Sequence, residues 1–122
     1  MASTKEGRVK NSIRKLLKQH RAYFTMPVMT GFATNGTPDF AICLHGRYLA
    51  IEAKAGDGLP TELQWVRLTE VQRAGGSTMV INETNMNVLE AWLKGDVQTV
   101  RAVRNMEGRG VMHHWTEKGA MK

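Results

Sequence analysis

Residues 37–54 read TPDFAICLHGRYLAIEAK and contain the strongest structural signal in the chain. Two apolar runs, 39–44 and 47–54, have the length and composition of β-strands. The residues between them, His45 and Gly46, form a two-residue link of the kind that joins the strands of a hairpin. The sequence therefore predicts an antiparallel pair of strands with polar side chains at its open end.

These polar side chains have an unusual spacing. Asp39 follows Pro38, and after a gap of 12 residues the chain reads Glu52-Ala53-Lys54. Because the side-chain period of a strand is 2, Glu52 and Lys54 point to one face of the sheet. Two carboxylates and an ammonium are costly on a buried face unless the carboxylates hold a divalent cation and the lysine acts on a water or a negative charge. The alternatives are a turn aspartate and an ordinary Glu-Lys pair on an exposed strand.

Hydrophobic periodicity and helix-terminating residues predict five further elements. They are helices at 4–20, 61–74 and 85–94 and strands at 23–29 and 77–81. Pro27 favours an edge position for the strand at 23–29. The resulting order is helix, three strands, helix, strand, helix, which indicates an α/β (α+β) domain with a mixed sheet flanked by helices. We assign residues 1–95 to this domain and 96–122 to a partly ordered C-terminal extension, in which 97–105 fits a helix or a strand.

The composition is that of a globular protein, with 122 residues and 42% hydrophobic side chains. No apolar run approaches the roughly 20 residues that a membrane span needs. Cys43 is the only cysteine, which excludes an intramolecular disulfide and a multi-cysteine zinc site. We expect a reducing, cytoplasmic setting, without a membrane or a small-molecule cofactor.

The net charge of +6 is concentrated at one end of the chain. Residues 1–21 hold seven lysine and arginine side chains and one acid, so the rest of the chain sums to zero. Four of these cations recur at i, i+4, i+8 and i+11 on the first helix: Lys10, Arg14, Lys18 and Arg21. Such a face fits the phosphates of a nucleic acid. A solvated helix face is the alternative.

Two further polar residues lie on the inward stripes of their helices. Glu6 is in register with Val9 and Ile13, and Gln64 precedes Leu68 by one turn. We expect both side chains to join the polar group of the hairpin. Glu6 also fits a simple first-turn acid, and Gln64 with Thr61 fits a capping box, a role compatible with the first.

Pro38-Asp39 followed by Glu52-Ala53-Lys54 resembles the PD-(D/E)xK nucleases. Together with the segments at 36–39, 51–56 and 60–64, the pattern is similar to the VRR-NUC branch of that superfamily, over about residues 4–94. The resemblance implies a restriction-endonuclease-like fold. It also implies that Asp39 and Glu52 are metal ligands, that Lys54 is catalytic and that Gln64 supports the site. The backbone carbonyl of Ala53 and a first-helix carboxylate, here Glu6, complete the expected ligands.

The small stand-alone members of this branch are largely viral and resemble dimeric Holliday-junction resolvases. The resemblance therefore implies a Mg²⁺- or Mn²⁺-dependent endonuclease that acts on branched or duplex DNA as a homodimer, in the bacterial host cytoplasm if the chain is viral. Leu63, Trp65 and Val66 lie off the inward stripe of their helix and are the expected dimer contacts. The alternative is that this helix is buried on two sides in a monomer. A general DNA or RNA nuclease and a non-catalytic nucleic-acid-binding module with the same fold remain alternatives.

Overall fold

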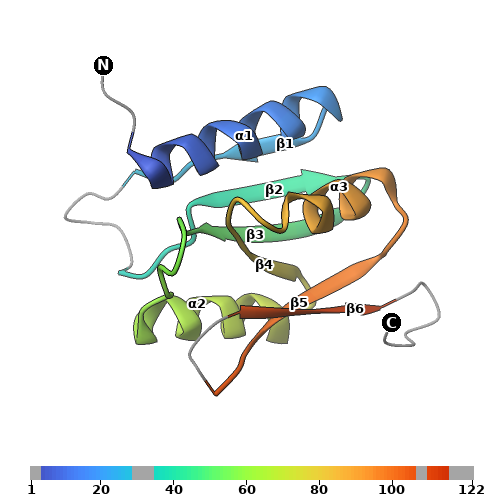
Figure 1. The fold of residues 1–122 in the computed structure, drawn as a ribbon. Helices are drawn as coiled ribbons and strands as arrows, with labels where there is room; N and C mark the ends of the chain where they lie inside the picture. The colour runs from blue at the N-terminus through green and yellow to red at the C-terminus, as the bar shows by residue number, and fades with distance from the viewer. Residues whose placement is uncertain (1–3, 29–34, 107–109, 116–122) are drawn as a thin grey trace.

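The computed structural model describes residues 4–28 and 35–106, and the backbone of residues 110–115. The elements in chain order are α1 (Lys5–Gln19), β1 (Tyr23–Thr25), β2 (Phe40–Leu44), β3 (Arg47–Ala53), α2 (Glu62–Arg73), β4 (Ser77–Ile81), α3 (Met86–Lys94), β5 (Thr99–Arg104) and β6 (Gly110–Trp115). In Figure 1, the strands β2, β3 and β4 lie between the helices α1 and α2. The predicted order is confirmed as far as α3, and β5 shows that 97–105 contains a strand.

The four strands β1 to β4 form one mixed sheet in the order β1-β2-β3-β4. β1 and β3 are antiparallel to β2, whereas β4 runs parallel to β3 after the α2 crossover. β5 and β6 form a separate antiparallel pair. The predicted mixed sheet flanked by helices is therefore confirmed. β1 ends at Thr25, before Pro27, and the last residue of the strand predicted at 23–29 lies outside the described residues.

A tight turn sets the register of the β2–β3 hairpin. His45 and Gly46 have φ angles of 51° and 79°, the left-handed conformation that a two-residue hairpin turn requires at both positions. Across the hairpin, Phe40 pairs with Ile51. Since antiparallel partners diverge by one residue on each strand, Asp39 comes opposite Glu52 at the open end.

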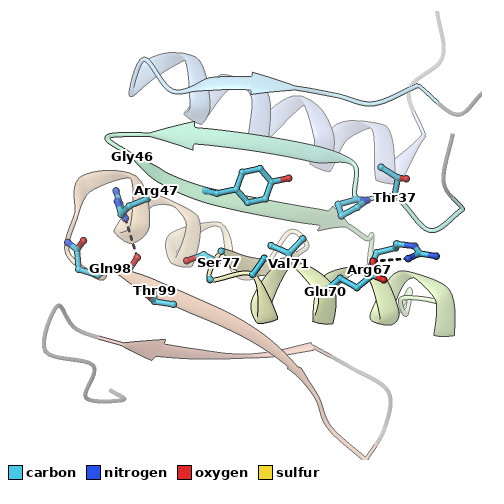
Figure 2. Close-up of a pocket in the computed structure, with 14 residues that line it drawn as sticks. Thr37, Gly46, Arg47, Arg67, Glu70, Val71, Ser77, Gln98 and Thr99 are labelled. Carbon is cyan, nitrogen blue, oxygen red and sulfur yellow. Dashed lines mark hydrogen bonds and ion pairs between the residues drawn. The ribbon is translucent and has the colours of Figure 1, made fainter.

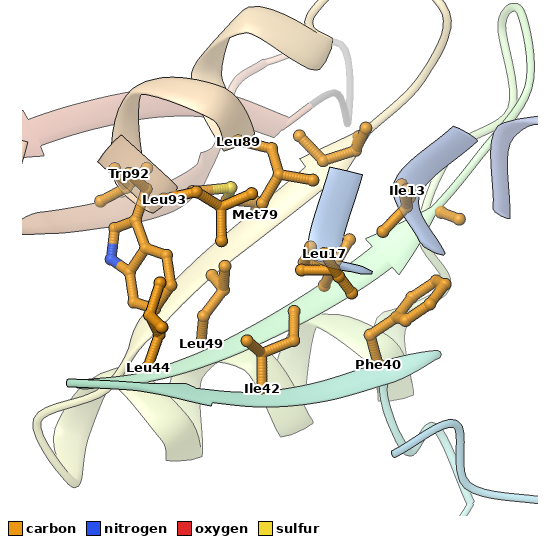
Figure 3. Packing of buried hydrophobic residues seen from close by; sticks show 14 of the residues in the cluster. Ile13, Leu17, Phe40, Ile42, Leu44, Leu49, Met79, Leu89, Trp92 and Leu93 are labelled. Atoms are coloured by element: carbon orange, nitrogen blue, oxygen red, sulfur yellow. The ribbon is translucent and has the colours of Figure 1, made fainter. Parts of the chain in front are cut away.

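The sheet separates two apolar cores. α1 and α3 cover one face, and the larger core between them and the strands (Figure 3) contains Val9, Ile13, Leu17, Phe40, Ile42, Leu44, Leu49, Ile51, Ala53, Met79, Ile81, Leu89, Trp92, Leu93 and Val100. α2 covers the other face with a smaller core of Ala50, Trp65, Leu68, Val80 and Ala102. The predicted alternation of β3 is confirmed, because Leu49, Ile51 and Ala53 lie in the first core and Ala50 in the second.

One expected surface residue is part of this smaller core. Trp65 is 7% exposed, so its prediction as a dimer contact is wrong. Its side chain belongs to the same core as Ala102 of β5, in the segment for which the sequence left a helix and a strand open. Leu63 and Val66 are exposed, at 37% and 47%. None of the described helices is long and apolar enough to cross a membrane.

Two glycines with the same φ of +79° provide a test of the loop that leads to Asp39. A Cβ at Gly36 would lie 2.8 Å from the carbonyl of Leu63, whereas a Cβ at Gly46 would meet nothing within 4 Å. We expect Gly46→Ala to lower the free energy of unfolding by about 1–2 kcal/mol, the cost of a left-handed alanine. Gly36→Ala should lower it by about 1–3 kcal/mol more, because α2 must move. Urea titration measures both, and equal effects would contradict the close approach of this loop to α2.

Candidate functional site

Glu52 is a buried carboxylate near the end of β3. It is 2% exposed, and no hydrogen-bond donor among the described residues reaches its Oε2 atom. Burial, followed by a hydrogen bond and the charge of Asp39, raises the pKa of Glu52 to about 9, whereas the charge of Lys54 acts in the opposite direction. A buried acid with such a shift is typical of functional sites rather than of ordinary cores.

Asp39 is held by the strand that carries Glu52. Its Oδ2 atom accepts a hydrogen bond of 2.8 Å from the backbone N–H of Ala53. Its Oδ1 atom lies 3.5 Å from the Nζ of Lys10. The hairpin therefore brings Asp39 and Glu52 together, as the sequence predicted, and a backbone contact orients one of them.

Gln64 links the first turn of α2 to the buried acid. Its Oε1 accepts a hydrogen bond of 2.8 Å from the backbone N–H of Thr61, and its Nε2 donates to Glu52 Oε1 over 3.1 Å. The Thr61 hydroxyl in turn accepts from the N–H of Gln64, which completes the capping box. The Gln64 side chain therefore makes both predicted interactions at the same time: it caps α2 with Thr61 and contacts the polar group of the hairpin at Glu52.

Lys54 directly follows β3. Its backbone N–H donates to the carbonyl of Ile81 over 2.9 Å, which continues the pairing with β4. Its side chain lines a small polar pocket of ≈ 190 Å³ together with Asn82, Thr84 and Asn85. Within the described part of the chain, the Lys54 ammonium makes no hydrogen bond or ion pair, although its charge lowers the pKa of Glu52.

Glu6 lies in the first turn of α1, near Asp39 and Glu52 (the acidic pair) but separated from them. Its side chain is 44% exposed, more than the inward position predicted from periodicity. Its charge contributes to the raised pKa of Glu52. Among the described residues, no three His, Cys, Asp or Glu side chains converge closely enough to hold one ion. The structure thus brings together Asp39 and Glu52, and Lys10 stands between Asp39 and Glu6.

The donors of Asp39 and Glu52 fit a divalent cation. Both supply hard carboxylate oxygens, the kind of ligand that Mg²⁺ and Mn²⁺ prefer. No donor in the described part of the chain reaches the buried Glu52 Oε2, which costs free energy unless a cation or a proton satisfies it. The observed group therefore matches the chemistry of a metal ligand better than that of a core residue.

The other three predicted DNA-binding cations continue from Lys10 along α1 and its end. Arg14 and Lys18 are exposed on the helix. Arg21 follows it, exposed and with a φ of 58°. A row of cations therefore leads away from the acidic pair along one edge of the molecule.

The sequence reasoning missed Glu83, which holds the loop after Lys54. Its carboxylate accepts hydrogen bonds of 2.9 and 3.2 Å from the backbone N–H of Gly56. Hydrogen bonds to its own and the Gly56 backbone lower the pKa of Glu83, and the charges of Lys5 and Arg8 add to the effect. No local pattern could have found this contact, because it joins residues that are 27 positions apart.

A larger pocket lies beside the acidic pair, between α2 and the β2–β3 hairpin (Figure 2). It has a volume of ≈ 650 Å³, and Thr37 and Pro38 line the end that leads to Asp39. On the α2 side, Arg67 donates to Glu70 over 2.7 Å. The lining of this pocket does not include Asp39, Glu52 or Lys54. The candidate site is therefore not this pocket, although the pocket is larger than the one beside Lys54.

No protein-family model and no curated protein matches the chain. Among solved structures, the chain is similar to one described as a "VRR_NUC domain", with a TM-score of 0.61 and 21% sequence identity. The match covers 73% of this chain and 95% of that one. The fold is therefore that of a VRR_NUC domain, which confirms the predicted restriction-endonuclease-like class. At this identity the likeness concerns the fold alone.

Replacing the buried acid gives a test of its ionisation. Because the folded pKa of Glu52 is about 9 and the unfolded value is near 4.5, the wild type should lose stability as the pH rises through this window. Glu52→Gln keeps a hydrogen-bonding amide and removes the charge. In EDTA we expect the variant to be more stable than the wild type, on the order of 3 kcal/mol at pH 8 and much less at pH 5.

Thermal melts between pH 5 and 9 measure this difference. The matched control is Glu70→Gln on the exposed side of α2, which should change stability by no more than about 1 kcal/mol. If Glu52→Gln and the wild type show the same pH profile in EDTA, Glu52 is not the buried acid described above.

Proposed function

We propose that this protein is a divalent-cation-dependent nuclease of the VRR-NUC type that hydrolyses phosphodiester bonds in DNA. The observation that supports this most strongly is the buried Glu52 carboxyl group beside Asp39, with one oxygen that no donor among residues 4–28 and 35–106 reaches. A non-catalytic binding module has no need for such a costly pair. The fold shared with a VRR_NUC domain adds an independent argument.

Asp39 and Glu52 would hold the cation, with the backbone carbonyl of Ala53 as a further oxygen and Glu6 as an outer acid. A bound Mg²⁺ or Mn²⁺ supplies Lewis-acid chemistry, by which a phosphate is polarised and a water is made more acidic. The protein contributes the orientation of the ligands. Ala53 N–H holds Asp39 over 2.8 Å, and Gln64 holds Glu52 over 3.1 Å.

Lys54 is the proposed catalytic residue. It follows Glu52 by two positions and has no partner for its ammonium among the described residues, so the group is available to a substrate. There it would orient or deprotonate the attacking water, or stabilise the charge that develops on the phosphate oxygens. Gln64 acts indirectly, since it positions Glu52.

The cations of α1 would guide the DNA to this site. Arg14, Lys18 and Arg21 are exposed and form the row that starts at Lys10. Cations in such a row bind phosphates regardless of sequence.

We further propose that the protein acts as a symmetric homodimer on branched DNA, in the manner of a junction resolvase. Two matched nicks in a four-way junction require two sites at a fixed separation, which two-fold symmetry supplies. With Trp65 buried, the exposed apolar side chains Leu63 and Val66 of α2 are the remaining candidates for the contact. Light scattering tests the assembly, and a monomeric mass at micromolar concentration would exclude it.

The decisive experiment is a cleavage assay with Mg²⁺, Mn²⁺ or EDTA on labelled duplex, flap, single-stranded and four-way-junction substrates. We expect cation-dependent cutting with a preference for the junction. Lys54→Ala should lower the rate by at least about 100-fold with little change in DNA affinity, because the ammonium acts on the reacting groups. Asp39→Asn should abolish both cutting and calorimetric Mn²⁺ binding.

Lys94→Ala, in the last turn of α3, is the matched control and should cut at the wild-type rate. Equal activity of Lys54→Ala and the wild type would remove Lys54 from the mechanism. DNA binding without cleavage under any cation would favour the non-catalytic module, and equal cutting of junction and duplex would leave a general nuclease. An RNA version of the panel separates the two nucleic acids.

The basic row gives a separate expectation for binding. Replacement of Arg14, Lys18 and Arg21 by Gln should weaken binding to all DNA sequences alike. It should also reduce the slope of log affinity against log salt by about 0.9 for each DNA phosphate that the protein no longer neutralises. Fluorescence anisotropy at several salt concentrations measures the slope, with Lys94→Gln as the control. An unchanged slope would place the DNA path elsewhere.

A further inference from the structure

Lys10 differs from the other cations of α1 because its ammonium lies among the acids of the candidate site. Its Nζ atom is 3.5 Å from Asp39 Oδ1 and 3.6 Å from Glu6 Oε2. Both distances exceed the roughly 2.8 Å of a charge-assisted hydrogen bond. The ammonium is therefore shared between two carboxylates without a short contact to either, and its side chain remains 31% exposed.

The carboxylate oxygens of Asp39 and Glu52 show for which atom Lys10 would compete with a bound cation. Asp39 Oδ2 is used by the N–H of Ala53, and Glu52 Oε1 by the amide of Gln64. The two remaining oxygens are Glu52 Oε2, which no donor among the described residues reaches, and Asp39 Oδ1, which faces Lys10. A cation bound to Asp39 Oδ1 would share this oxygen with the ammonium.

We propose that the Lys10 ammonium, which pairs with Asp39, would leave this carboxylate when a divalent cation binds there and would move to the substrate phosphate. The proposal rests on the proposed function and deepens it, since it gives one residue of the basic row a role at the reacting phosphate. A divalent cation at Asp39 would repel the Lys10 ammonium, because both are positively charged. The flexible four-carbon stem of lysine lets the group move while its Cα stays on α1.

The geometry separates Lys10 from its neighbours on the helix. Lys10 is one turn from Glu6, so after displacement from Asp39 it keeps one carboxylate nearby. Arg14 and Lys18 lie one and two turns further along, exposed and without an ion pair among the described residues. Only Lys10 is therefore expected to influence cation binding in the absence of DNA.

The first measurement is the calorimetric affinity for Mn²⁺ without DNA. Lys10→Met removes the competing charge and keeps the length of the side chain, so we expect Mn²⁺ to bind about 3- to 10-fold more tightly. Lys18→Met is the matched control and should leave the affinity unchanged. Unchanged or weaker Mn²⁺ binding by Lys10→Met overturns the exchange. Circular dichroism checks folding, and Lys10→Gln is the second variant if Lys10→Met does not fold.

The second measurement is single-turnover cleavage at saturating Mn²⁺ and DNA. Lys10→Met should be about 10- to 100-fold slower despite its tighter metal binding, because the displaced ammonium no longer reaches the phosphate. Lys94→Met, outside the proposed site and the basic row, should react at the wild-type rate, and Lys10→Arg should recover part of the rate. A wild-type rate for Lys10→Met overturns the phosphate role.

These two measurements also separate the inference from the function on which it rests. If the wild type cuts no substrate of the panel, the nuclease assignment and the phosphate role both fail. The Mn²⁺ affinities then still decide whether Lys10 competes with a cation for Asp39.

Discussion

The register of the β2–β3 hairpin is the constraint on which the rest of the site depends. The left-handed His45-Gly46 turn pairs Phe40 with Ile51, which brings Asp39 opposite Glu52. The backbone N–H of Ala53 then orients Asp39 over 2.8 Å. A slip of one residue would turn Glu52 into the larger core beneath α1 and α3. The same alternation that builds this core therefore places the acid on the α2 side of the sheet.

Gln64 joins the folding of α2 to the state of the acidic pair. One side-chain amide caps the helix through Thr61 and donates to Glu52. The first turn of α2 is thus fixed relative to β3 by groups that the site also needs. Since no donor among the described residues reaches the remaining buried oxygen of Glu52, a proton or a cation has to satisfy it.

The elements and the pair of acids were predictable because local patterns encode them: strand alternation, a two-residue turn and a capping box. The burial of Trp65 was not predictable, because it shares a core with Ala102 of β5 and the sequence left this segment open between a helix and a strand. The contacts of Lys10 with Asp39 and of Glu83 with Gly56 were also hidden. They join distant segments through side chains, so only the assembled fold defines them.

The sum of the charges at the candidate site gives a reason for the position of Lys10 between Asp39 and Glu6. The site gathers three carboxyl groups, Glu6, Asp39 and Glu52, and two ammonium groups, Lys10 and Lys54. With the pKa of Glu52 at about 9, its carboxyl is protonated near neutral pH, and the metal-free group is neutral overall. A divalent cation would replace that proton and leave one positive charge in excess. In the proposed nuclease, a single phosphodiester would carry the negative charge that restores neutrality, so a cation and a phosphate would complement the site only together.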